Sequence, residues 1–224
     1  MTLSSRTILD QDLAQLKDNI IRLSSAADES IERAMLALQN RDVALANQVV
    51  ADDETINQIR FEVEEKALQI LATQAPAASD LRTVIAAIHL AIELERIGDH
   101  ASGIARLVER MEGEDEIDTL HKLPKMAKRA RDMIRQGIDA FIQADPELAL
   151  NMIKRDDKID RQYNKLFRES LEEMKEDAYI RRATFLLWVG HNLERIGDRA
   201  TNIAERVIFM CTGEFVETPT TLDA

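Results

Sequence analysis

Carboxylate side chains spaced four residues apart are the feature of this sequence that could do chemistry. Glu95 with Asp99 forms one such pair, and Glu194 with Asp198 forms another. On a helix, side chains four residues apart lie on one face. Clustered carboxylate oxygens suit hard cations such as Mg²⁺, Mn²⁺ or Fe³⁺, and no set of His and Cys residues indicates zinc instead.

Two further pairs with the same spacing precede these motifs: Asp53 with Asn57, and Asp156 with Asp160. In an antiparallel helical hairpin, residues equally far from the turn lie at the same level. The first two pairs are equidistant from residue 76, and the second two from residue 177. Both positions fall in expected turns, so the pattern predicts that each half of the chain brings two such pairs together.

Ion pairing on a solvated helix face is the competing interpretation, with Arg96, Arg195, Arg60 or neighbouring lysines as the cationic partners. Glu95 and Asp99 also continue an apolar stripe, which consists of Leu81, Ile85, Ile88 and Ile92. The stripe predicts that both acids face inward, where a bare charge is costly and must be paired or bound to a cation.

Gly98 and Gly197 lie inside expected helices, where glycine costs about 1 kcal/mol relative to alanine. Close approach of two helices is the favoured reason, and room for a metal or an anion is the alternative. His100 follows Asp99 directly and is a weak candidate ligand. Packing is the simplest role for His89, His191, Phe185 and Trp188, and Cys211 is interpreted as a passive thiol.

Six helices are expected to position these residues, because apolar residues recur at alternating spacings of three and four. Asp42 is a candidate N-cap, as is Asp145, which precedes Pro146. Ser79 or Asp80 is the corresponding candidate for the third helix. The expected helices span approximately residues 9–38, 43–73, 80–111, 123–141, 146–176 and 178–213.

The segment Leu94–Asp99 recurs unchanged as Leu193–Asp198, and Arg82 corresponds to Arg181 at the same offset. Such repetition indicates an internal duplication. The predicted fold class is all-α, with two tandem antiparallel three-helix bundles that form a pseudo-repeat. The expected units are residues 1–115 and 116–213, followed by a mobile polar tail at 214–224.

The composition limits the possible functions. A net charge of −12 argues against non-specific binding of nucleic acid, which needs a basic face. The single cysteine, the absence of a signal-peptide pattern and the shortness of the apolar runs favour a cytoplasmic protein with no membrane insertion. We find no phosphate loop, nucleophile elbow or nucleotide motif, so catalysis is not expected.

The two repeats, their Glu-Arg-Ile-Gly-Asp segments and the segment Gln74–Arg82 closely resemble the PhoU family of phosphate-specific transport system accessory proteins. The resemblance covers about residues 5–213. It implies a negative regulator of phosphate uptake and of the phosphate-starvation response (Pho regulon). Such a regulator would be a cytoplasmic, often homodimeric adaptor between the phosphate ABC transporter and a sensor histidine kinase, with peripheral membrane association compatible with that role.

The resemblance also implies metal binding, since some family members hold iron, zinc or other metals through Glu/Asp-x-x-x-Asp motifs. Here these motifs are Asp53/Asn57, Glu95/Asp99, Asp156/Asp160 and Glu194/Asp198. Iron, zinc, manganese and magnesium all remain open. Asn57 departs from the family pattern and brings no charge, so the first half is expected to bind metal more weakly. The alternatives are an accessory subunit of another phosphate or ion transporter and, less favoured, a metal-dependent phosphohydrolase.

Overall fold

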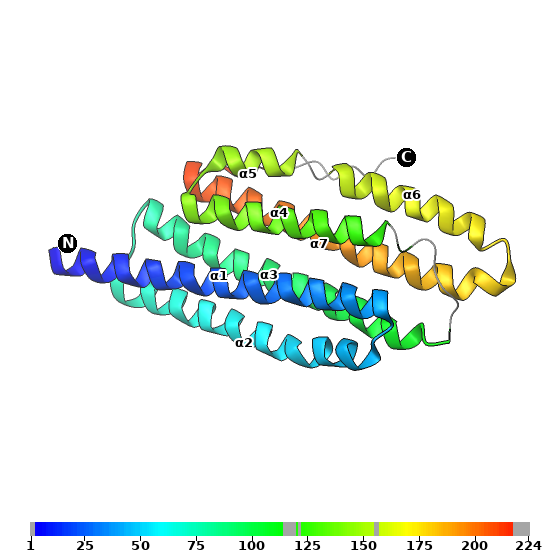
Figure 1. Ribbon diagram of the computed structural model, residues 1–224. Coiled ribbons are helices and arrows are strands. Elements are labelled where there is room, and N and C mark those ends of the chain that lie inside the picture. Colours follow the sequence, from blue (N-terminus) through cyan, green and yellow to red (C-terminus); the bar gives the residue numbers. More distant parts are fainter. Residues whose placement is uncertain (1–2, 114–119, 121, 155–156, 217–224) are drawn as a thin grey trace.

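The computed structural model describes the chain outside residues 1–2, 114–119, 121, 155–156 and 217–224 (Figure 1). Every regular element in those described ranges is helical, which confirms the predicted all-α fold with two helical repeats. The elements are α1 (Leu3–Asn40), α2 (Val43–Gln74), α3 (Ser79–Arg110), α4 (Leu123–Gln143), α5 (Pro146–Ile153), α6 (Asp157–Glu173), the short 3₁₀ helix η2 (Asp177–Tyr179) and α7 (Ile180–Thr212). The predicted boundary at residues 115/116 and the end of the polar tail lie outside the described residues.

Two of the expected helix caps are present. The carboxylate of Asp42 accepts a hydrogen bond from the Leu45 N–H, and that of Asp145 accepts from the N–H groups of Glu147 and Leu148. The prediction for the third helix is wrong. Ala78 occupies the N-cap position of α3 with φ 49°, and no side chain caps it. The Asp80 carboxylate instead accepts a hydrogen bond from Arg6, on α1, at 2.6 Å.

The helix expected over residues 146–176 is divided. Its first part, α5, ends at Ile153, where the Lys154 N–H bonds to the carbonyls of Leu150 and Met152. The second part, α6, begins at Asp157. Asp156, one of the predicted ligands, lies in the undescribed gap between them. The apolar spacing continues on both sides of the gap, and therefore did not reveal the interruption.

The third helices of the two repeats, α3 and α7, pack against each other at the centre of the molecule. Helices α1 and α2 complete the first bundle around α3, and α4, α5 and α6 complete the second around α7 (Figure 1). Helices α1 and α4 also contact each other on one side of the central pair. The two bundles are therefore joined along a seam, which is formed mainly by α3 and α7.

Arg82 and Arg181 make reciprocal contacts at the two ends of this seam. The Arg82 Nε donates to the Met210 carbonyl at 3.0 Å, near the end of α7. The Arg181 Nη2 donates to the Arg110 carbonyl at 3.0 Å, at the end of α3. The last carbonyls of a helix lack partners within the helix and carry partial negative charge. Each repeat thus uses the equivalent arginine to cap the C-terminal end of the other repeat's central helix.

A second pair of reciprocal contacts lies near the middle of the seam. Arg199 Nη1 donates to Glu93 Oε2 at 3.4 Å, and Asn202 donates to the same oxygen at 3.2 Å. The corresponding contact joins His100 Nδ1 to Asn192 Oδ1 at 3.0 Å. In the repeat alignment, His100 corresponds to Arg199 and Glu93 to Asn192. The two halves are therefore related by a pseudo-two-fold axis, as in an isologous dimer interface.

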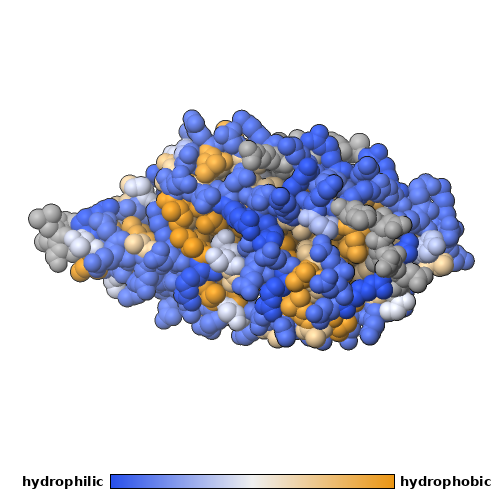
Figure 2. All heavy atoms as spheres, viewed as in Figure 1, coloured by the Kyte–Doolittle hydropathy of each residue, from blue (hydrophilic) through white to orange (hydrophobic). Residues whose placement is uncertain are grey.

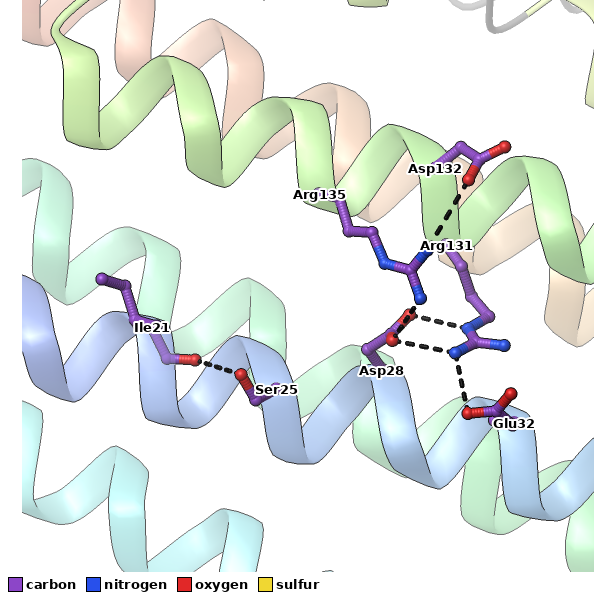
Figure 3. A network of polar contacts seen from close by, with 7 residues as sticks. All are labelled: Ile21, Ser25, Asp28, Glu32, Arg131, Asp132 and Arg135. Carbon is purple, nitrogen blue, oxygen red and sulfur yellow. Dashed lines mark hydrogen bonds and ion pairs between the residues drawn. The ribbon is translucent and has the colours of Figure 1, made fainter.

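An ion-pair network joins α1 to α4 (Figure 3). The Arg131 guanidinium binds both Asp28 carboxylate oxygens, at 2.7 and 2.9 Å, and donates to Glu32 at 3.0 Å. Arg135 also donates to Asp28, at 2.8 Å. Burial alone would raise the pKa of Asp28, but the hydrogen bonds from the two arginines outweigh burial and lower it. The network therefore joins the two bundles through charged side chains.

We predict that Asp28→Ala lowers the free energy of unfolding by about 2 kcal/mol, because it leaves a half-buried arginine short of its bidentate partner. Urea titration near neutral pH measures this loss. Since the folded-state pKa of Asp28 is lowered, its contribution is present above pH 3.8 and is lost as the pH falls through the folded pKa.

Asp132→Ala is the matched control for this change, because Asp132 forms only a long, exposed ion pair with Arg135 at 3.8 Å. We expect it to cost less than about 0.5 kcal/mol. Equal losses in the two variants would show that the Asp28 network does not hold the bundles together.

Candidate cation-binding centres

The first acidic centre consists of Asp53 and Asn57 on α2 and of Glu95 and Asp99 on α3. Its two helices approach each other closely at Gly98. A Cβ atom at Gly98 would lie 2.8 Å from the Ile56 Cδ1 and 3.4 Å from the Asp53 Oδ1. The expectation that Gly98 permits close helix packing is therefore confirmed, and the absent side chain leaves space that the Asp53 carboxylate borders.

The carboxylates of the first centre repel one another, which makes their ionised forms less stable. Burial, followed by the negative charge of Asp99, raises the pKa of Asp53. The same two causes, burial and then Asp99, raise the pKa of Glu95, against the opposing effect of Arg96. The predicted register of α2 against α3 is thus confirmed for these three acids. Asn57 is half-buried on the same side of α2 and contributes no charge.

Arginines only partly compensate the first centre. Arg96 lies 3.6 Å from Glu95 and 3.5 Å from Asp99, at distances longer than a strong charged hydrogen bond. Arg60 donates to Glu64 at 2.5 Å rather than to the centre. Arg96 therefore forms ion pairs with the first centre, as the competing interpretation expected, but both are long.

The second acidic centre consists of Asp160 on α6 and of Glu194 and Asp198 on α7. Arg195 donates to Asp198 at 2.7 Å, and the His191 Nδ1 lies 3.1 Å from Glu194. Burial nevertheless raises the pKa of Asp198 to about 6, with Glu194 and Asp160 adding to the shift and Arg195 opposing it. The second centre thus resembles the first, with a closer arginine.

The acids do not face the core, which corrects an expectation from the sequence. The stripe that they continue on α3 is partly exposed, with Leu81 at 39% and Ile92 at 37%. The core face of α3 is the adjacent stripe, which consists of Val84, Ala87, Leu90, Ala91, Leu94, Ile97, Ala101 and Ile104. Both stripes are apolar with the same spacing, so periodicity alone did not distinguish them. The Asp99 side chain is 43% exposed, at the rim between α2 and solvent.

One residue singled out from the sequence, His100, takes another role. His100 reaches across the seam to Asn192 and not toward the first centre's α2 residues. Glu93 and Asn192, which the sequence analysis missed, lie two residues before Glu95 and Glu194 and connect the neighbourhood of each centre to the opposite repeat. Helical spacing could have identified them, because Glu93 lies on the same face of α3 as Arg82, and Asn192 lies on the same face of α7 as Arg181.

The donor set suits a hard cation in its chemistry, because the ligating atoms are oxygens whose negative charge is incompletely balanced. In the described ranges, however, no three or more His, Cys, Asp and Glu side chains are grouped so that they could hold one ion. Asp156 falls outside those ranges. A cation would therefore require side-chain rotation, in which Arg96 and Arg195 release the carboxylates that they contact.

We predict that Asp198→Asn stabilises the chain by about 1–2 kcal/mol near pH 7.5, less than the full shift implies because the carboxylate is a third exposed. The raised folded-state pKa means that the acid's cost grows as the pH rises from 3.8 to about 6. The advantage of Asn should therefore vanish below about pH 4.

Thermal unfolding in the presence of a chelator, as a function of pH, checks this prediction. Asp139→Asn, at an exposed position of α4, is the control and should change the melting temperature little at any pH. A melting temperature for Asp198→Asn that is below that of the parent at pH 7.5 would contradict the proposed cost of the ionised Asp198 carboxylate.

Comparisons with a family model, with curated proteins and with solved structures all match this chain to PhoU proteins over most of its length. The PhoU domain matches twice, over residues 20–108 and 123–207. The phosphate-specific transport system accessory protein PhoU homolog of Clostridium acetobutylicum is 34% identical over 215 residues, which cover 95% of this chain and 98% of that protein. The protein of the same name from Caulobacter vibrioides is 36% identical over 206 residues, which cover 91% and 90% of the two chains. The crystal structure of the phosphate transport system regulatory protein PhoU from Streptococcus pneumoniae has a TM-score of 0.88 at 31% identity and covers 94% of this chain and 100% of that chain.

Proposed function

This chain belongs to the PhoU family, and we propose that it is an accessory protein of a phosphate-specific transport system that negatively regulates phosphate uptake and the Pho regulon. The observation that carries the proposal is the match to accessory proteins over nearly their whole length, including 98% of the Clostridium acetobutylicum protein. The solved relative from Streptococcus pneumoniae, which bears the word regulatory in its name, supports the same role.

The proposed mechanism is protein contact that changes with the state of the transporter, with the chain as an adaptor between the phosphate ABC transporter and a sensor histidine kinase. We place this adaptor in the cytoplasm, where it would act peripherally and as a homodimer. None of the helices in the described part of the chain is both long and apolar enough to cross a bilayer. A long helical bundle provides wide surfaces for such contacts.

A regulatory role fits the described site better than catalysis. The acids of both centres contact arginines, and a polar groove of about 550 Å³ lies elsewhere, between α1 and α2. Both cationic residues that line the groove contact carboxylates, Arg22 that of Glu62 at 3.1 Å and Lys66 that of Asp12 at 2.6 Å. We therefore propose that the chain is not an enzyme. Release of p-nitrophenol from p-nitrophenyl phosphate by the metal-loaded chain, lost in Asp198→Asn, would favour the phosphohydrolase alternative.

We further propose that the two acidic centres bind iron, zinc, manganese or magnesium. The residues that would hold the ion are Asp53, Asn57, Glu95 and Asp99 in the first half, and Asp156, Asp160, Glu194 and Asp198 in the second. A bound cation would neutralise carboxylates that at present raise one another's pKa. The ion would have a structural role there, in which its positive charge balances that of the carboxylates.

The second centre should bind a metal ion more tightly, because Asn57 gives the first centre one charge fewer. We predict that Asn57→Asp tightens binding at the first centre by roughly tenfold, about 1.4 kcal/mol. Calorimetric titration of the full chain with Mn²⁺ measures both events. Glu194→Gln should remove the tighter event and Glu95→Gln the weaker, and the reverse assignment would contradict the prediction.

Deletion of the gene tests the regulatory proposal directly. We expect a phosphate-controlled reporter to become active in phosphate-rich medium, with restoration by the intact gene. Repression that remains normal in the deletion strain would refute the proposal. Neighbouring genes for a different phosphate or ion carrier would favour the alternative in which the chain serves that carrier without a kinase.

A further inference from the structure

The side of the central helices that bears the acidic centres also exposes apolar stripes. On α3 the stripe that ends in Glu95 and Asp99 begins with Leu81 and includes Ile92. On α7 the corresponding stripe is more polar: Ile180, Thr184, Leu187 and His191 lead to Glu194 and Asp198, and the exposed Trp188 lies beside it, one turn after Thr184. The opposite faces of α3 and α7 are buried in the bundles. We call the side formed by these stripes and by their neighbours on α2 and α6 the rear face.

The outer helices extend this apolar surface. Continuing from Asp53 and Asn57 at helical spacing, α2 presents Phe61 and then Leu68, which is 63% exposed. Continuing from Asp160 on α6, the same spacing reaches Phe167 and Leu171, both exposed. Contacts between α6 and α7 place this stripe beside that of α7, since Tyr163 and Leu166 flank Gly190.

The two halves of the rear face are arranged about the pseudo-two-fold axis. The reciprocal contacts of Glu93 and Asn192 bring the two acidic centres to the same level near the middle of the seam. Since α3 and α7 run antiparallel, the apolar stripes extend from there toward opposite ends. From Leu81 to Asp99 the stripe is about 27 Å long, enough for five turns of a partner helix.

The rear face carries many of the exposed apolar residues of the molecule, and apolar patches also appear on the face that Figure 2 shows. Among the described residues it carries more than half of the large hydrophobic side chains that are exposed: Phe61, Leu68, Leu81, Ile92, Phe167, Leu171, Ile180 and Trp188. Trp188, the only tryptophan of the chain, is 47% exposed and contacts Phe185 edge-on at 6.0 Å. Exposed tryptophan flanked by apolar surface is typical of an interaction site.

Charge decides what kind of partner fits this face. Without a bound cation, its middle carries six described carboxylates, from Asp53, Glu95, Asp99, Asp160, Glu194 and Asp198. The cationic groups that act on them, and compensate them in part, are Arg60, Arg96, Arg106, Arg195, Arg199 and, when protonated, His191. The chain as a whole has a net charge of −12. A second copy docked through the same face would oppose one acidic middle to another, and an anionic membrane would be repelled as well. A cationic partner gains from both features.

We propose that the rear face docks amphipathic helices of a partner protein, whose apolar side chains cover the two stripes and whose Lys or Arg residues approach the acidic middle. A helix with apolar residues at spacings of three and four presents one apolar face, which can cover an apolar surface of this kind. This inference deepens the proposed adaptor function and rests on it, because it assumes that the chain acts by protein contact. Leu68 in the first half and Trp188 in the second are the proposed anchors.

Site-specific photo-crosslinking in living cells tests the proposal on the full chain. A photoreactive amino acid, p-benzoylphenylalanine, replaces Leu68, Leu171 or Trp188 on the rear face. Matched positions are Ile21 and Leu36, which are also apolar and exposed and lie on α1, on the other side of the molecule. We expect crosslinks from the three rear positions to a segment that mass spectrometry shows to be a basic, amphipathic helix, and at least tenfold less product from the α1 positions.

A second arm removes the apolar surface. The double variant Leu68→Ser/Leu171→Ser should reduce crosslinking from position 188 at least tenfold, whereas Ile21→Ser/Leu36→Ser should not, with circular dichroism confirming that both fold. Crosslinks only from α1, crosslinks to a second copy of this chain, to lipid or to an acidic segment, or no rear crosslink at all would overturn the proposal.

The outcomes separate this inference from the regulatory function. Crosslinks from α1 to the phosphate transporter would leave the function standing and overturn the rear-face assignment. Rear-face crosslinks to a basic amphipathic helix of a protein unrelated to phosphate transport would do the opposite.

Discussion

The packing of α3 against α7 is the contact on which the rest of the molecule depends. Each of these helices is the central element of its own bundle, so whatever fixes their relative position also fixes the two bundles. Arg82 and Arg181 bind the last carbonyls of the opposite helix, and contacts of Glu93 and Asn192 hold the middle. A shift of one helix along the other would break contacts at both ends at once. The Asp28–Arg131 tie between α1 and α4 adds a second attachment on one side.

The acidic centres follow from this arrangement. Close packing of α2 on α3 at Gly98 brings Asp53 beside Glu95 and Asp99, and the equivalent helices of the second half bring Asp160 beside Asp198. The residues directly beside the motif acids, His100 and Arg199, cross the seam to the other half. A change in charge at either centre therefore occurs next to the contacts that position the bundles. The Asp99 carboxylate, at the rim of the first centre, is open to solvent.

Much of the fold could be read from the sequence because the repeat and the helical spacing agree. The duplication of Leu94–Asp99, the caps at Asp42 and Asp145 and the hairpin register of Asp53 against Glu95 were all accessible to local rules. The orientation of α3 was not, because two adjacent apolar stripes share one spacing and only tertiary packing selects the one with Leu90 and Leu94 as the core. The break after Ile153 and the cap at Ala78 also depend on packing beyond the local chain. Contacts across the seam join residues about one hundred positions apart, which no local pattern reports.

The asymmetry across the seam has a consequence for evolution of the chain. A true homodimer must make both reciprocal contacts with the same pair of residues, so any substitution is made twice. Here His100 faces Asn192 while its counterpart Arg199 faces Glu93, and Asn57 has Asp160 as its counterpart. Fusion of the halves into one polypeptide has freed each copy to change alone. The two halves are consequently chemically different, and a ligand that contacts both of them can bind in one preferred orientation.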